Sequence, residues 1–159
     1  MRDRPIYIDT GFLVMFSFLL LSLPIRLVIA WVLAVGIHEL GHFIALRLLR
    51  IRVYSVRISV FGAVMVTEPV SGWREGVCAI AGPVAGFCVL LVARWVPCTA
   101  VFAFVHSVYN LLPIPPLDGG RVAKSIIHTL QRQIRQKMPL KSKRTNSTIS
   151  KTIHLERYK

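Results

Sequence analysis

The sequence predicts an all-α integral membrane protein with about four transmembrane helices, a membrane-associated β-hairpin and a basic C-terminal tail. Three observations support this fold class. Hydrophobic residues make up 54% of the 159 residues. The mean hydropathy is +0.59, and the apolar residues come in long blocks, as is typical of membrane proteins. The basic residues gather at one end, since residues 121–159 hold 11 Lys and Arg and a single acid.

Four apolar segments are the candidate spans, at residues 6–23, 27–49, 76–93 and 98–114. A helix needs about 20 residues to cross the bilayer core, which segments 27–49 and 76–93 provide. The first segment has no small-residue cleavage site after it, so we expect a retained span rather than a signal peptide. Arginines follow the second segment and the basic tail follows the fourth. The positive-inside rule places both on the cytoplasmic side of a multi-pass cell-membrane protein.

Residues 51–68 break the pattern of long apolar segments. Tyr54, Val56, Ile58 and Val60 alternate with polar residues, which is the period of a half-buried strand. Gly62 then precedes a second run rich in β-branched residues. The sequence therefore predicts a β-hairpin at the membrane face.

The C-terminal part divides into two predicted segments beyond a transmembrane core of residues 1–120. Residues 121–138 place apolar side chains at helical spacing among basic ones, which predicts an amphipathic helix at the interface. Residues 139–159 are basic, have little to bury and are expected to be disordered. Such a tail favours anionic lipid headgroups as partner, then an acidic protein. Nucleic acid is not expected, because the tail charges do not alternate with aromatic residues.

The second apolar segment contains His38-Glu39-Leu40-Gly41-His42, an HExxH pattern. Residues four apart share one face of a helix, so His38 and His42 can bind one metal ion. Glu39 lies near that ion and can take a proton from a water molecule. The pattern also occurs by chance on soluble helices. In a membrane helix, however, an acid costs about 2.5–3.5 kcal/mol, and a divalent cation offsets that cost.

A catalytic zinc usually has three protein ligands, so a third is required. The candidates are Asp118, His106, His128 and His154. Asp118 is favoured because it ends a proline-rich stretch, NLLPIPPLD, that cannot form a regular helix. Broken backbone at membrane depth is tolerated only beside protein or a watery cavity. The charges of Zn²⁺, Asp118 and Glu39 also sum to zero, which suits a site of low dielectric. The alternatives are a plain turn role for Asp118 and a hydrogen-bonded core role for His106.

HELGH on a membrane helix, followed by NLLPIPPLDGG, resembles the site-2 protease family of intramembrane zinc metalloproteases. The downstream stretch is similar to the family's Asn-Pro-Asp-Gly element through Asn110, Pro113, Asp118 and Gly119. The resemblance implies that His38, His42 and Asp118 are the zinc ligands. It also implies that Glu39 is the general base and that Asn110 stabilises the oxyanion near the scissile carbonyl.

The short connection between the second and third apolar segments resembles a compact subgroup of this family, the stage IV sporulation protein FB proteases. These process a membrane-associated pro-sigma factor. The resemblance implies regulated intramembrane proteolysis of a membrane-embedded or membrane-tethered protein. A regulatory membrane protein and a second copy of the chain are further candidate partners. The 51–68 hairpin would then bind substrate by strand addition.

Two other functions compete with a protease. The first is a non-catalytic membrane adaptor, whose basic tail binds lipid or a partner and whose metal is structural. A structural zinc is usually closed by four protein ligands, and His106 is the candidate for the fourth. The second is a metal transporter, which needs polar residues on several spans, whereas the segment from Gly76 to Ala93 has none.

Overall fold

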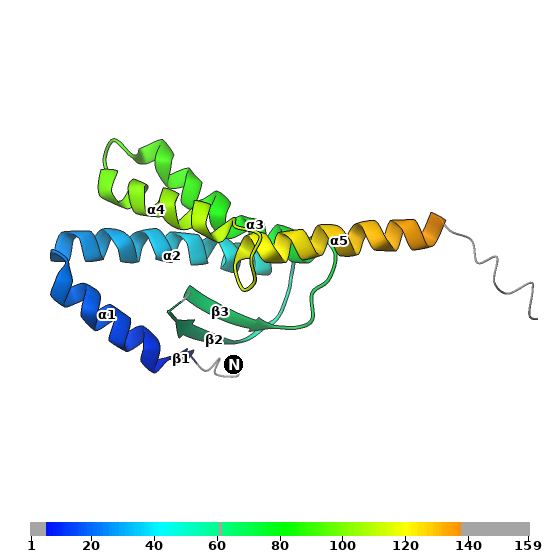
Figure 1. The fold of residues 1–159 in the computed structure, drawn as a ribbon, viewed down its shortest axis with the longest axis horizontal. Helices are drawn as coiled ribbons and strands as arrows, with labels where there is room; N and C mark the ends of the chain where they lie inside the picture. Colours follow the sequence, from blue (N-terminus) through cyan, green and yellow to red (C-terminus); the bar gives the residue numbers. More distant parts are fainter. Residues whose placement is uncertain (1–5, 61, 138–159) are drawn as a thin grey trace, which may run out of the picture. The chain divides into compact units, whose positions relative to one another are not determined.

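A computed structural model of the chain describes residues 6–60 and 62–137. The chain divides into two units, Met1–Ile127 and His128–Lys159. The protein is mostly helical, with a small β-sheet (Figure 1). Its elements are β1 (Ile6–Ile8), α1 (Thr10–Ser22), α2 (Ile25–Leu48), β2 (Val53–Ser59), β3 (Gly62–Thr67), α3 (Trp73–Cys88), the short 3₁₀ helix η1 (Val89–Val92), α4 (Pro97–Asn110) and α5 (Asp118–Lys137). The predicted basic tail of residues 139–159 lies outside the described residues.

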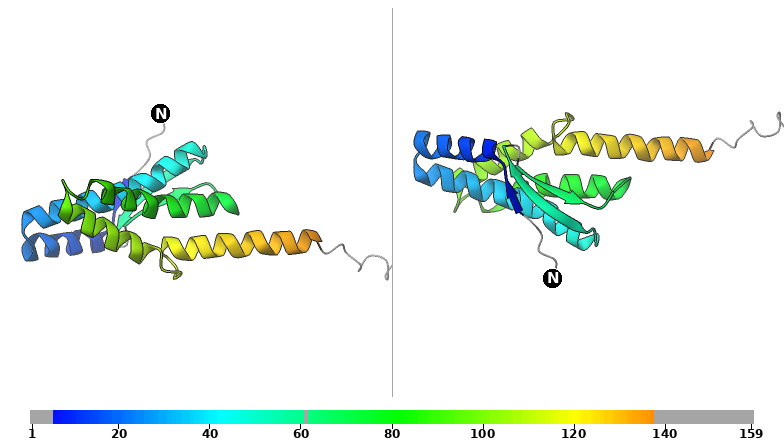
Figure 2. Two further views of the ribbon diagram at one scale, coloured as in Figure 1. Left: turned by 90° about the horizontal axis from the view of Figure 1, so that it is seen from above. Right: turned by 90° about the horizontal axis from the view of Figure 1, so that it is seen from below.

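Helix α2 is the centre of the first unit. It packs against α3 and α4, which lie on one side of it, while α1 and the sheet lie on the other (Figure 1). Figure 2 shows the same elements from above and below. Small side chains form the contact, since Ala34, Ala100 and Ala103 are buried together with Val89. Small residues allow helix backbones to approach closely, which is how helices associate in membranes.

Two helices are long and apolar enough to cross a membrane, Ile25–Leu48 and Trp73–Val92. Only 28% and 33% of their apolar windows are buried, so most of each apolar surface faces outward. A core helix of a soluble protein would bury that surface. With 13 and 14 residues, α1 and α4 are shorter than the about 20 residues that a span requires. The count of four spans therefore stays a prediction.

The predicted hairpin is present as the antiparallel pair β2 and β3, in which Val56 lies opposite Met65. A third strand, β1, pairs in parallel with β2, so β3 is an edge strand. The sequence predicts one apolar span over residues 6–23, and the structure differs at its start. Asp9 separates the strand from the helix, because its side chain accepts a hydrogen bond from the Gly11 N–H and caps α1.

Candidate metal centre

The HExxH pattern lies in the second half of α2, which is helical without interruption from Ile25 to Leu48. Its spacing puts His38 and His42 on one face, as the sequence predicts. His38 is only 2% exposed, which is unusual for so polar a side chain unless it is paired. The edge of its ring contacts the rings of both His42 and His106, at centroid distances of 4.9 and 4.6 Å.

Asp118 is the first residue of α5 and is 7% exposed. It follows a turn, residues 111–117, that folds back against the start of the helix. Gly119 permits that fold, because a Cβ at this position would overlap the carbonyl group of Leu111. The turn that positions the Asp118 carboxylate therefore packs so closely against the helix that the next residue must be glycine.

Three ligand atoms from two distant parts of the chain converge. Nε2 of His42 lies 3.0 Å from Oδ2 of Asp118 and 3.2 Å from Nε2 of His38. Nε2 of His38 lies 3.1 Å from the same carboxylate oxygen. These three residues form a group whose ligand atoms all lie within 4.8 Å of one another. The two histidines of HExxH and Asp118 thus form one cluster.

The chemistry of this cluster fits a metal ion. Nδ1 of His42 lies 2.7 Å from the carbonyl oxygen of Cys78 on α3. A carbonyl only accepts, so Nδ1 carries a proton, and in the neutral form of the ring Nε2 presents a lone pair. This lone pair faces the Asp118 carboxylate and the second imidazole at hydrogen-bond distance. Converging acceptors repel one another unless a cation lies between them, and two His with one carboxylate suit catalytic zinc.

Gly82 makes the orientation of His42 possible. It lies one turn after Cys78 in α3, and a Cβ added there would overlap the imidazole of His42. The missing side chain leaves room for the ring to reach the Cys78 carbonyl. His42 is therefore oriented by a backbone atom of another helix, the carbonyl oxygen of Cys78 in α3.

Glu39 is held by the edge of the sheet. Its Oε1 accepts a hydrogen bond from the backbone N–H of Ala63 in β3, over 3.0 Å. The preceding residue, Gly62, has a φ of 114°, in the region that glycine tolerates best. A Cβ on Gly62 would also lie 2.5 Å from the same carboxylate oxygen. The hairpin turn and the acid of HExxH thus fit together.

Asn110 ends α4 and is 7% exposed. Its Nδ2 donates to the backbone carbonyl of His106 and lies 3.1 Å from Nε2 of the same residue. Among the described residues, the group that could hold a metal does not include His106. His106 instead contacts the ring of His38 and the carboxamide of Asn110, which it helps to orient.

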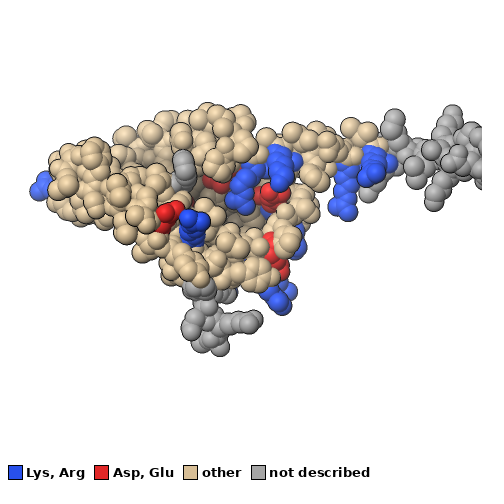
Figure 3. Space-filling model, turned by 60° about the horizontal axis from the view of Figure 1, so that its bottom comes forward, with Lys and Arg blue, Asp and Glu red and all other residues tan. Residues whose placement is uncertain are grey.

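A cavity of about 440 Å³ opens beside the cluster. Its walls include His38, Glu39, His42, Asn110, Asp118 and Arg121. Strand β3 forms another wall, through Gly62 to Met65 and Thr67. Figure 3 shows the hollowed face, with acidic and basic side chains around the hollow.

The structure brings together all five residues proposed from the sequence for the site. Of the other ligand candidates, His128 lies in α5 within the second unit, and His154 lies outside the described residues. Sequence reasoning missed the backbone groups of Cys78 and Ala63, because no residue type marks them. It also missed Arg121, whose guanidinium lies 3.9 Å from the Asp118 carboxylate. A basic residue three positions after the acid on a helix was the available signal.

Comparison with known proteins gives three findings. No family model matches the chain. A protein from Synechocystis sp., described as a candidate zinc metalloprotease, is 32% identical over 106 residues, and the match covers 57% of this chain but only 28% of that protein. Among solved structures, the site-2 protease from Methanocaldococcus jannaschii is similar with a TM-score of 0.63 at 23% identity, covering 98% of this chain and 79% of that one. The chain therefore has the fold of that protease.

Proposed function

We propose that this chain is an intramembrane zinc metalloprotease of the site-2 protease family. The observation that carries the proposal is the convergence of His38, His42 and Asp118 with the Glu39 carboxylate beside them, in a cavity lined by an edge strand. The likeness to a site-2 protease fold and the metalloprotease relative support it. The substrate is a peptide bond of a membrane-embedded or membrane-tethered protein.

The membrane location rests on the outward apolar surfaces of α2 and α3. Large exposed hydrophobic side chains are found along both helices, including Leu33, Leu48 and Val84. Lipid is the environment that makes such surfaces favourable. We extend this to a multi-pass cell-membrane protein of four spans, with α1 and α4 completing the bundle. The arginines after α2 orient the active site toward the cytoplasm.

Each residue of the site has a distinct role in the proposed reaction. His38, His42 and Asp118 would hold a zinc ion, which would supply Lewis-acid chemistry for the scissile carbonyl and for the attacking water. Glu39 takes the proton from that water and returns it to the leaving amine. The Asn110 carboxamide stabilises the negative charge that develops on the carbonyl oxygen. His106 keeps the carboxamide in position, and the Ala63 N–H does the same for Glu39.

Strand β3 offers a way to hold the substrate. Ala63 directs its N–H away from β2, toward Glu39, and strand alternation directs the backbone groups of Met65 the same way. A transmembrane helix hides its amides, so proteolysis requires it to open into an extended form. Pairing with the outer edge of β3 would stabilise that form. Unchanged cleavage after a proline substitution at Met65 would rule out this strand addition.

A non-catalytic adaptor is the other function to consider. A structural zinc would need a fourth protein ligand. Within residues 6–60 and 62–137, the metal-binding group contains three residues, and His106 is engaged with Asn110 instead. Three ligands with a cavity beside them favour catalysis.

We keep the basic tail as a region for anionic lipid, and a regulator or a second copy as further partners. We also propose regulated proteolysis of a pro-sigma factor or similar regulator.

The test is cleavage of membrane-tethered candidate regulators co-expressed with the wild-type chain or with Glu39→Gln. The isosteric amide keeps the site's shape but cannot take a proton, so cleavage should fall by at least about 100-fold. Zinc content, measured on the purified variant, should be unchanged. Cleavage by Glu39→Gln at the wild-type rate would show that the mechanism is wrong.

A further inference from the structure

A second cavity lies next to the metal centre, with a volume of about 480 Å³. It is lined by residues of α1, α2, α4 and the β2–β3 hairpin. The two cavities share Glu39, Ser59, Gly62, Ala63 and Asn110 among their lining residues. The second cavity therefore begins where the scissile peptide would lie and extends away from it.

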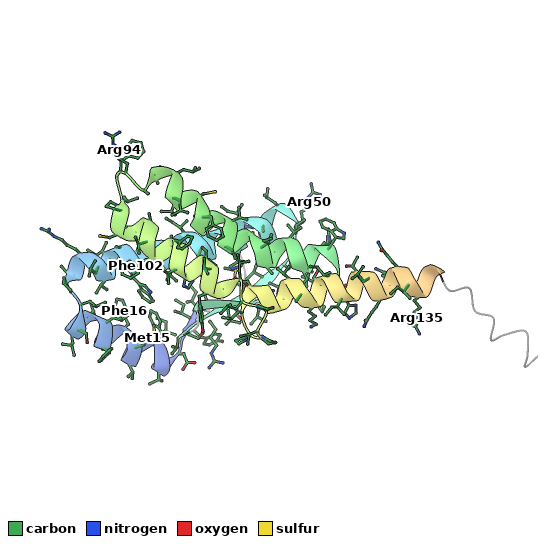
Figure 4. All side chains as sticks on the ribbon, turned by 45° about the horizontal axis from the view of Figure 1, so that its top comes forward. Met15, Phe16, Arg50, Arg94, Phe102 and Arg135 are labelled. Carbon is green, nitrogen blue, oxygen red and sulfur yellow. The ribbon has the colours of Figure 1, made fainter. Side chains whose placement is uncertain are left out.

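The two cavities differ in chemistry. The first contains the charged groups of Asp118 and Arg121, whereas Glu39, at the border with the first, is the one charged residue among the described residues that line the second. The remaining walls of the second cavity are largely apolar and aromatic, with Phe12 and Met15 from α1, Trp31 and Val35 from α2, and Ile58 from β2. Figure 4 labels Met15 and Phe16 on α1, at the side of this helix near α2 and the hairpin. Such walls select an apolar group.

We propose that this cavity is a specificity pocket for a large apolar side chain, of the Leu or Phe class, on a residue flanking the scissile bond. The proposal rests on the proposed protease function. Continuity with the metal centre identifies the occupant, because a peptide bound at Glu39 and Asn110 must place a neighbouring side chain in or near this space. The volume lies within the range of ligand pockets, about 300–1,000 Å³.

Gly36 provides a way to fill the pocket without disturbing the metal site. It lines the second cavity and not the first, and a Cβ added there meets no other group within 4 Å. Gly36→Leu should therefore place its side chain in the pocket. Met15→Ala on the opposite wall should enlarge it. Cys88→Leu is a matched control, because Cys88 is exposed and lines neither cavity.

The experiment uses a single-span membrane reporter that wild type cleaves at a mapped bond, with Ala, Leu or Phe placed on each side of that bond. Wild type and Cys88→Leu should prefer Leu or Phe over Ala by at least about 10-fold in cleavage rate at one position. Gly36→Leu should lose that preference while it still cleaves the Ala reporter, and Met15→Ala should shift the preference from Leu toward Phe. Zinc content measured in parallel verifies that each variant retains the site.

The outcomes separate this proposal from the protease function. If zinc-loaded wild type cleaves none of the reporters and no co-expressed regulator, the protease function itself fails. If wild type cleaves them but Gly36→Leu and Met15→Ala keep the wild-type preference, the cavity does not select side chains. That result, or equal cleavage of all three reporters by wild type, would overturn the pocket and leave a lipid chain as its occupant.

Discussion

The backbone N–H of Ala63 donates a hydrogen bond to Oε1 of Glu39 over 3.0 Å, so the edge of the sheet holds the carboxylate proposed as general base. This bond joins a strand to a helix across 24 residues of sequence. It restricts the rotamers of a glutamate that would otherwise have three free side-chain torsions. The hairpin is thus both a wall of the cavity and a support for Glu39.

Removing the Ala63 N–H should impair catalysis more than removing a neighbouring edge amide. Ala63→Pro deletes the donor to Glu39 without breaking a bond to β2, because edge prolines are tolerated where the N–H points outward. Met65→Pro deletes an outward N–H that is proposed to pair with substrate, as Ala63→Pro does, and so controls for the loss of edge pairing by itself. We expect a lower kcat for Ala63→Pro than for Met65→Pro, measured on one reporter. Equal rates for the two variants would show that the bond does not position Glu39.

Asn110 should be needed for turnover but not for metal binding. Asn110→Ala removes the carboxamide proposed to stabilise the oxyanion, so kcat should fall by about 100- to 1,000-fold. His106→Ala removes the partner that orients this carboxamide and should cause a smaller loss. Zinc content should stay at the wild-type level in both variants, because neither residue belongs to the metal-binding group. Loss of zinc from His106→Ala would instead favour a closed structural site and the adaptor function.

Gly82 should control the affinity for zinc from the neighbouring helix. Gly82→Ala places a Cβ against the imidazole of His42 and should displace the ring from the Cys78 carbonyl. Loss of such an orienting partner typically lowers metal affinity by about 10- to 100-fold. Gly36→Ala, in α2, is the matched control, since its Cβ meets no other group within 4 Å. Competition with a zinc chelator measures the zinc affinity of both variants. Identical affinities would contradict the role of Gly82.

Much of the site can be predicted from the sequence, because the types and spacing of its side chains are typical of a metal site. The spacing of His38 and His42 specifies one helical face, and the prolines before Asp118 exclude a helix where the carboxylate must turn inward. The partners of these residues were harder to predict. The Cys78 carbonyl and the Ala63 N–H are backbone atoms that every residue type possesses. Their roles become visible only when the helices and the hairpin are packed together.

The first strand shows a second limit. Ile6–Ile8 and the helix Thr10–Ser22 are both apolar, so hydrophobicity alone merges them into one segment. Asp9 is the local signal that separates them, as a helix N-cap. The pairing of β1 with β2 is a long-range contact across about fifty residues, which short-range periodicity does not encode.

The most direct test of the central claim is the zinc content of purified Asp118→Ala, compared with wild type and with Glu39→Gln. Asp118 lies 80 residues along the chain from His38, so its participation is what turns the HExxH helix into a three-ligand site. We predict one zinc ion per chain in wild type and Glu39→Gln, and a loss of zinc from Asp118→Ala. Full zinc occupancy in Asp118→Ala would contradict the proposed metal centre.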